Sequence, residues 1–185
     1  MDKKYKIMID AGHGGKDSGA CAIDSNKVFL LEKNYNLIFA KTLFNICKED
    51  PRLVPFLTRK DDTFVSLADR VNFSNIEKAD LFISLHCNSA EGTDEASDCQ
   101  IYYKSGKKLA DCIFKYISPV DKKKTKWSKT LSANFYVIRK TKCIAVLIEI
   151  AFMDNKKDQE LLNDCDFQDN FCFAVYSAII EYLKI

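Results

Sequence analysis

The chain has 185 residues, of which 47% are hydrophobic and 29% are charged, and its formal net charge is +2. These values are typical of a single soluble globular domain that is long enough to bury a substantial core. So small a positive charge gives no reason to expect a nucleic-acid partner. No apolar stretch reaches the ~18 residues of a membrane-spanning helix, so we expect no membrane insertion.

Eight cysteines are many for this length, but no two of them have the C-x-x-C spacing. Several lie inside apolar segments, as Cys47, Cys112 and Cys172 do. Disulfide frameworks are typical of small secreted chains without a core. We therefore interpret most of these cysteines as buried free thiols of a protein that folds in a reducing compartment. A zinc–thiolate site is the alternative, and the spacings do not favour it.

The first predicted elements are a strand and a helix, separated by a loop. Residues 7–11 are an apolar run, which predicts a buried strand, and the glycine-rich turn after it contains His13. Residues 16–27 are polar and predict a loop. The spacing of the apolar residues after Glu32 predicts an amphipathic helix that ends before Pro51.

The middle of the chain repeats this alternation. Residues 53–58 predict a short strand, and Ser66 predicts the N-cap of a second helix. Residues 80–85 form an apolar run, which predicts a strand that ends at His86. Residues 88–98 are small, polar and acidic, and they predict a loop.

The C-terminal part continues in the same way. Residues 144–148 are a strongly apolar strand candidate, and this strand ends at Glu149. The other predicted elements are a strand at 99–103, a helix at 106–117, an exposed loop at 121–130, a strand or edge segment at 135–139, a short helix at 158–162 and an amphipathic helix at 167–182. We predict an α/β fold in one domain, residues 1–185, with a single twisted, mostly parallel sheet and helices on both faces.

The loop at 121–130 is the most basic stretch of the chain. Its lysines surround Trp127 and are Lys122, Lys123, Lys124, Lys126 and Lys129. One interpretation is a solvated run of charge on the surface. The alternative is a contact with an anionic polymer, with Trp127 as an apolar platform.

Three predicted strands lead into groups that bind metals or move protons, namely His13, His86 and Glu149. The carboxyl ends of parallel strands meet at one edge of an open α/β sheet, where ligands bind. The two histidines are the only ones in the chain. Each of the three residues alone is commonly a hydrogen-bonded structural residue, but their combination favours a functional site.

Two imidazoles and one carboxylate are a ligand set for a catalytic zinc, which needs three protein ligands and an open position for water. Glu32 is the best early carboxylate for this set, because its helix must pack back beside the first strand. Stabilisation of the helix dipole is its alternative role. Zinc lowers the pKa of bound water to ~7. Glu149 is then placed to accept and pass on protons.

Other catalytic signatures are absent from the sequence. It has no H-E-x-x-H motif and no G-x-S-x-G elbow, and its glycine-rich turn lacks the Lys-Ser/Thr of a phosphate-binding loop. These absences argue against a helix-borne zinc site, a serine hydrolase elbow and a nucleotide-binding loop.

Residues 9–20 (IDAGHGGKDSGA) resemble the opening signature of the zinc-dependent N-acetylmuramoyl-L-alanine amidases, amidase family 3. Later blocks of the same family are matched in order by Glu32 at a helix start, LTR at 57–59, SLADR at 66–70, LHCN at 85–88, YVIR at 136–139 and VLIE at 146–149. The resemblance implies that His13, Glu32 and His86 bind one zinc ion and that Glu149 is the catalytic acid and base. It also implies cleavage of the amide between N-acetylmuramic acid and L-alanine of the stem peptide.

We therefore predict a peptidoglycan hydrolase of endolysin or autolysin type that uses a zinc-activated water. The alternatives are a zinc peptidase that cuts within the stem peptide and a non-catalytic cell-wall-binding module. The expected partners are peptidoglycan and anionic wall polymers, and we expect a monomer. The residues before the first strand include no apolar stretch, so we expect no signal peptide, and we therefore expect synthesis in the cytoplasm and action on the bacterial cell wall after release.

Overall fold

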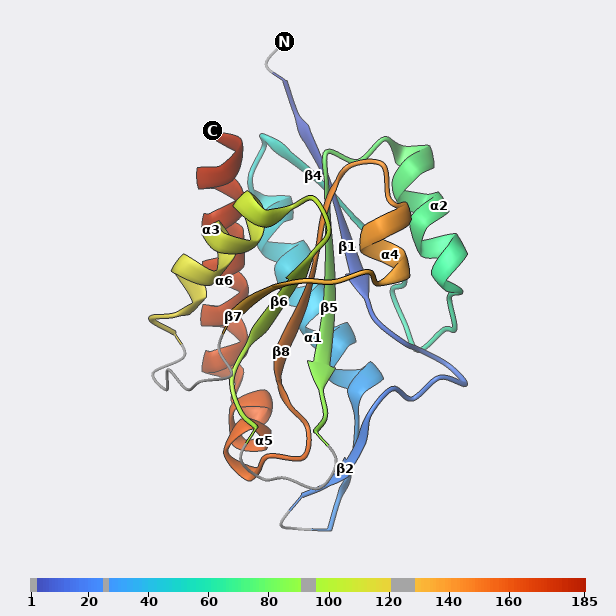
Figure 1. The fold of residues 1–185 in the computed structure, drawn as a ribbon, viewed down its shortest axis with the longest axis vertical. Helices are drawn as coiled ribbons and strands as arrows, with labels where there is room; N and C mark the ends of the chain where they lie inside the picture. Colours follow the sequence, from blue (N-terminus) through green and yellow to red (C-terminus); the bar gives the residue numbers. More distant parts are fainter. Residues whose placement is uncertain (1–2, 25–26, 91–95, 121–128) are drawn as a thin grey trace.

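The computed structural model describes residues 3–24, 27–90, 96–120 and 129–185 (Figure 1). The elements follow one another as β1 (Tyr5–Ala11), β2 (Cys21–Ile23), β3 (Phe29–Leu31), α1 (Glu32–Glu49), β4 (Leu53–Leu57), α2 (Leu67–Glu77), β5 (Leu81–Asn88), β6 (Gln100–Tyr103), α3 (Lys107–Ile117), β7 (Lys129–Ser132), α4 (Tyr136–Lys140), β8 (Ile144–Phe152), α5 (Lys156–Asn163) and α6 (Cys165–Leu183). No helix within these ranges is long and apolar enough to cross a membrane.

The main sheet has six strands among the described residues, in the order β4-β1-β5-β8-β6-β7. The neighbouring strands β4, β1, β5 and β8 are parallel to one another. The strand β6 is antiparallel to β8, and β7 is parallel to β6. The predicted single, mostly parallel sheet is therefore confirmed. Parallel neighbours also explain why β1, β5 and β8 are such continuous apolar runs, since strands buried on both faces lose the alternation of polar residues.

Helices cover both faces of this sheet, as predicted (Figure 1). On one face, the apolar sides of α1, α3 and α6 bury Phe39, Ile113 and Phe171 against the strands. On the other face, α2 and α4 pack a smaller cluster that includes Val71 and Val137. Burial of these apolar side chains is the main force that holds the layers together.

Two predicted loops contain strands instead. Residues 16–27 were predicted to form a loop, but β2 lies within them and pairs antiparallel with β3 as a separate hairpin. The basic loop at 121–130 falls largely outside the described residues, and β7 begins at its end, at Lys129. β2 and β7 have only three and four residues. Strands this short cannot show a clear alternation of apolar and polar residues, so the sequence does not predict them.

The segment 135–139, predicted as a strand or edge, is helical in α4. The adjacent residues Val137 and Ile138 are both buried, at 4% and 3% exposure. Consecutive side chains of a strand point to opposite faces, so a strand on this surface would bury only one of them. A helical turn directs both toward the sheet, and this packing decides the conformation.

Two strands are longer than predicted. β5 continues past His86 to Asn88, and β8 continues past Glu149 to Phe152. His86 and Glu149 therefore lie within paired strands, directly beside each other in the parallel register. The predicted ends were wrong because the ladder between β5 and β8 continues, through a local shift in register, beyond the apolar runs.

All eight cysteines belong to the described residues and carry thiols that are not joined in disulfides. Cys47, Cys87, Cys99 and Cys172 are buried, so half of them, rather than most, are buried thiols. The predicted N-cap is confirmed, because the Ser66 hydroxyl accepts a hydrogen bond from the backbone N–H of Asp69 at 3.1 Å.

Candidate metal centre

His13, Glu32 and His86 come together at the edge of the sheet where the parallel strands end. His13 follows β1, Glu32 is the first residue of α1, and His86 lies near the end of β5. One ligand atom from each of them can be chosen so that all three atoms lie within 4.8 Å of one another. The structure thus brings together the three residues that the sequence predicts as metal ligands.

The carboxylate of Glu32 lies between the two imidazoles. Its Oε2 is 3.1 Å from Nε2 of His13, and its Oε1 is 2.9 Å from Nδ1 of His86. The two rings meet edge to face with their centroids 4.9 Å apart. On the other side of the His13 ring, Oδ2 of Asp17 lies 2.9 Å from Nδ1.

Glu32 is fixed by donors from three separate segments. Its Oε2 accepts a hydrogen bond from the backbone N–H of Ala20 at 2.8 Å. Its Oε1 accepts from the backbone N–H of Cys87 at 3.1 Å and from Nδ2 of Asn36 at 3.0 Å. Because Glu32 is only 4% exposed, these hydrogen bonds hold its carboxylate in a single orientation.

Two glycines make room for this close approach. A Cβ atom at Gly12 would lie 2.2 Å from Cε1 of His86. At Gly19, which has a φ of 65°, a Cβ atom would lie 2.4 Å from Oε2 of Glu32. Any other residue at either position would displace a predicted ligand, so the glycines are part of the site.

The three residues shift one another's pKa values. Burial opposes the charged form of His13, but the carboxylates of Glu32 and Asp17 outweigh it and raise the pKa of His13 to about 9. Burial also opposes the charged form of His86, but the carboxylate of Glu32 outweighs this effect and raises the pKa of His86. Burial also favours protonation of Glu32, yet the hydrogen bonds and charges of the two histidines hold its pKa far below its usual range.

Glu149 lies beside this group on β8, in register with His86 on β5. Burial is the main cause that raises the pKa of Glu149 to about 7, and the neighbouring charge of Glu32 raises it further, while the histidines lower it. Its Oε2 atom is buried and has no hydrogen-bond partner among the described residues. A carboxyl group in this state can hold or release a proton near neutral pH.

These residues fit a zinc ion. Two imidazoles and one carboxylate are a common ligand set for catalytic zinc. On the strand beside His86, Glu149 adds a buried carboxylate oxygen that has no hydrogen-bond partner among the described residues. The set also agrees with the preference of zinc for nitrogen and oxygen ligands in a tetrahedral arrangement.

The comparisons with known proteins identify the family. The model of the N-acetylmuramoyl-L-alanine amidase family, Amidase_3, matches residues 7–181. The chain belongs to this family. The amidase LytC of Bacillus subtilis is 34% identical over an alignment of 183 positions, which covers 96% of this chain but only 35% of LytC. The endolysin of Bacillus phage SPP1 is 34% identical over 97% of this chain and 66% of that protein.

A solved structure supports the same assignment. The catalytic domain of CwlV, an amidase from Bacillus (Paenibacillus) polymyxa var. colistinus, matches with a TM-score of 0.89 and 36% identity. The match covers 98% of this amidase-family chain and 99% of that catalytic domain. The chain thus spans about a third of the length of LytC and nearly the whole of the CwlV catalytic domain.

Sequence reasoning missed a buried polar network behind the metal centre. Asp10, the last residue but one of β1, accepts hydrogen bonds from Thr58, Ser84 and Arg70 at 2.7 Å each. Arg70 in turn donates to the carbonyl oxygen of His13 at 2.6 Å. The signal that could have revealed the network is a carboxylate inside an apolar strand, since such a group is rarely buried unless it is paired.

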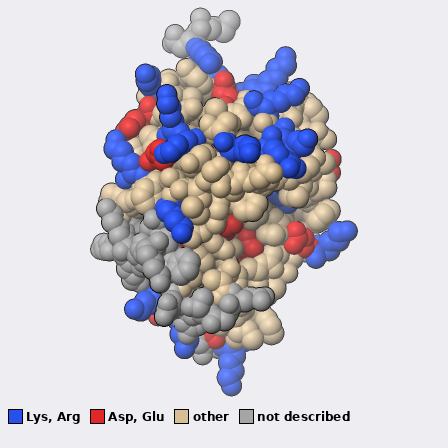
Figure 2. All heavy atoms as spheres, in the orientation of Figure 1, with Lys and Arg blue, Asp and Glu red and all other residues tan. Residues whose placement is uncertain are grey.

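The surface of this amidase-family chain carries its charges unevenly. Figure 2 shows many of the Lys and Arg side chains of this face toward the upper end of the view, with acidic atoms both among them and in the middle of the face. The predicted contact of Lys122, Lys123, Lys124 and Lys126 with an anionic polymer concerns residues outside the described ranges.

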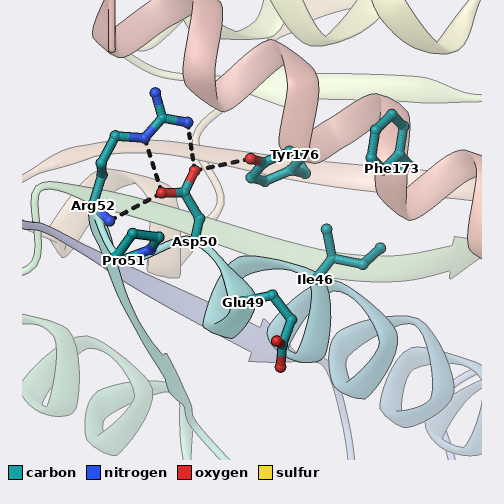
Figure 3. Close-up of a pocket in the computed structure, with 7 residues that line it drawn as sticks. All are labelled: Ile46, Glu49, Asp50, Pro51, Arg52, Phe173 and Tyr176. Atoms are coloured by element: carbon teal, nitrogen blue, oxygen red, sulfur yellow. Dashed lines mark hydrogen bonds and ion pairs between the residues drawn. The ribbon is translucent and has the colours of Figure 1, made fainter.

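A hollow of about 640 Å³ lies at the far end of α1 from Glu32 (Figure 3). Phe173 and Tyr176 of α6 line it, together with the residues around Asp50. Asp50 is already satisfied by Arg52 and by the hydroxyl of Tyr176. Because α1 has 18 residues and thus extends for roughly 27 Å, this hollow is separate from the metal centre.

Proposed function

We propose that this chain hydrolyses the amide bond that joins the lactyl group of N-acetylmuramic acid to L-alanine of the peptidoglycan stem peptide. The observation that carries the proposal is the group of two histidines and one glutamate with a second, proton-holding glutamate beside it. Membership of the amidase family supports the choice of bond, and the match to the CwlV catalytic domain supports assigning the reaction to this one domain.

His13, Glu32 and His86 are the proposed ligands of one zinc ion. When bound, zinc polarises the substrate carbonyl and lowers the pKa of water. The histidines must be neutral to act as ligands, so binding displaces the protons that Glu32 now stabilises on them. The backbone donors around Glu32 keep its carboxylate oriented, as partners of metal ligands do in other proteins.

Glu149 is the proposed proton carrier of the reaction. As a base, its carboxylate takes a proton from the attacking water while the water oxygen bonds to the carbonyl carbon. As an acid, it then gives this proton to the amide nitrogen, and the C–N bond breaks to leave a carboxylic acid on the lactyl group and an amine on L-alanine. The carboxylic acid then ionises to a carboxylate, and the amine takes up the released proton. A pKa near neutrality suits a residue that serves first as a base and then as an acid.

The test is to digest purified cell walls and identify the new amines by chemical labelling and mass spectrometry. The proposal expects labelled L-alanine at the amino end of intact stem peptides. A zinc peptidase would expose the amine of a residue within the stem, and a wall-binding module would release no soluble fragments. Either of these results contradicts the proposal, and zinc analysis of the same sample links the activity to the metal.

A further inference from the structure

Arg59 is a buried arginine whose hydrogen bonds go to main-chain oxygens. It lies two residues after β4 ends and is 4% exposed. Its guanidinium donates to the carbonyl oxygens of Ala11, Gly12, Lys33 and Asp61 at distances from 2.7 to 2.9 Å. Burying a charge is costly unless strong hydrogen bonds compensate. The role of Arg59 therefore depends on which segments of the chain carry these four carbonyl oxygens.

One atom of Arg59 joins the two segments that carry proposed metal ligands. Its Nη2 donates to the carbonyl oxygen of Gly12 at 2.8 Å and to that of Lys33 at 2.7 Å. Gly12 directly precedes His13, and Lys33 directly follows Glu32. Two short hydrogen bonds from one nitrogen fix how closely the loop after β1 approaches the first turn of α1.

Other hydrogen bonds also join this loop to the start of α1, because Nζ of Lys33 donates to the carbonyl oxygen of Gly15 at 2.9 Å and the backbone N–H of Lys33 donates to that of Ser18 at 3.1 Å. They reach the loop after His13, whereas Arg59 binds the residue directly before it. Nδ2 of Asn36 also reaches the carbonyl oxygen of Gly12, but at 3.3 Å and without charge. Arg70 binds the carbonyl oxygens of Ala11 and His13, and its hydrogen bonds within the described ranges do not include α1. Arg70 therefore holds the loop to the sheet, whereas Arg59 holds the loop to the helix.

We infer that Arg59 is a positioning residue for the metal site, because its guanidinium sets the spacing between His13 and Glu32. The inference rests on the proposed zinc site. Lysine keeps the charge, but its single ammonium lacks the planar fork that reaches several oxygens at once. Arg59→Lys therefore keeps the positive charge at this position but removes the hydrogen-bonded link between the two segments.

The experiment measures zinc affinity of the full chain by competition with a coloured chelator, together with thermal unfolding of the zinc-free protein. We expect Arg59→Lys to weaken zinc binding by about 10- to 100-fold, the usual effect of losing a residue that orients metal ligands. The control is Ile113→Ala on α3, which leaves a cavity in the core and lowers stability away from the two segments. It should keep the zinc affinity of the wild type.

Equal zinc affinities of Arg59→Lys and the wild type would overturn the inference, and so would a loss of affinity in Ile113→Ala that matches its loss of stability. Arg59→Gln, a neutral variant that retains two donors, replaces Arg59→Lys if that variant does not fold. If neither folds while Ile113→Ala does, Arg59 is required for folding and the inference is wrong. If the wild type fails to bind zinc, or His86→Ala still binds it, the proposed zinc site itself fails.

Discussion

Replacing Glu149 by glutamine keeps the shape of the side chain and removes its ability to carry a proton. The structure places this residue beside His86 in neighbouring strands and gives its Oε2 no partner within the described ranges. If Glu149 is the proton carrier, hydrolysis should slow by about 10²- to 10⁴-fold, the usual contribution of a positioned acid or base. Zinc content should stay at the wild-type level, because Glu149 is not among the proposed ligands.

The same substitution should make the zinc-free protein more stable at alkaline pH. Burial raises the pKa of Glu149 from 4.5 to about 7, so the folded state binds this proton more tightly than the unfolded chain does. The charged carboxylate therefore destabilises the fold as the pH rises above 4.5, and the full cost is present above pH 7. This cost is at most about 3 kcal/mol, and less because part of the side chain is solvated.

Three measurements on one preparation test this reasoning: the rate of wall hydrolysis, the zinc stoichiometry, and the urea unfolding of zinc-free protein at pH 4 and pH 8. Glu160→Gln, an exposed glutamate of α5, is the control and should behave as the wild type in all three. Undiminished hydrolysis by Glu149→Gln would refute the proton-carrier role. Loss of zinc would instead make Glu149 a metal ligand. Stability that is unchanged at pH 8 would contradict the raised pKa.

Three other predictions concern the metal and the wall. His86→Ala should lose stoichiometric zinc and most activity, and full metal occupancy by elemental analysis would show that the ligand assignment is wrong. Because ligands must be deprotonated and the pKa values of both His13, at about 9, and His86 are raised, the apparent zinc affinity should rise tenfold or more per pH unit as the pH increases toward 9; a flat profile in competition titrations would contradict this. Neutralising Lys122, Lys123, Lys124 and Lys126 should weaken wall binding mainly at low salt, since attraction between charges in water is screened over ~8 Å at physiological ionic strength; a salt profile of binding like that of the wild type would contradict a contact of these lysines with the wall.

The sheet could be predicted because its central strands carry an unambiguous signal. β1, β5 and β8 lie side by side in the interior, so their sequences are apolar on both faces and stand out from the polar segments around them. The approach of His13 to His86 then follows from the parallel topology, which brings the ends of neighbouring strands to one edge. The position of Glu32 was predictable for a related reason, since its helix returns beside β1.

The remainder depends on contacts between segments that are distant in the sequence. The helical conformation of α4 is decided by the surface on which Val137 and Ile138 pack, and five residues are too few to show a helical period. The burial of Arg59 has no local sequence signal, because arginine is mostly exposed in proteins. Only the fold reveals that the main-chain oxygens around the metal centre supply its hydrogen-bond partners.

The two glutamates of the site show how the surroundings divide their roles. Both lie near the same two histidines, yet the pKa of Glu32 is lowered and that of Glu149 is raised. Glu32 accepts hydrogen bonds from two backbone N–H groups and a side-chain amide, which stabilise its charged form as a metal ligand requires. Glu149 is half-buried beside His86 and one of its oxygens has no donor in the described part of the chain, so its pKa is raised to about 7 and it can take up a proton and release it again near neutral pH. For the two residues to exchange roles, the hydrogen-bond donors around Glu32 would have to surround Glu149 on β8 instead. We therefore assign Glu32 on α1 as the metal ligand and Glu149 on β8 as the proton carrier.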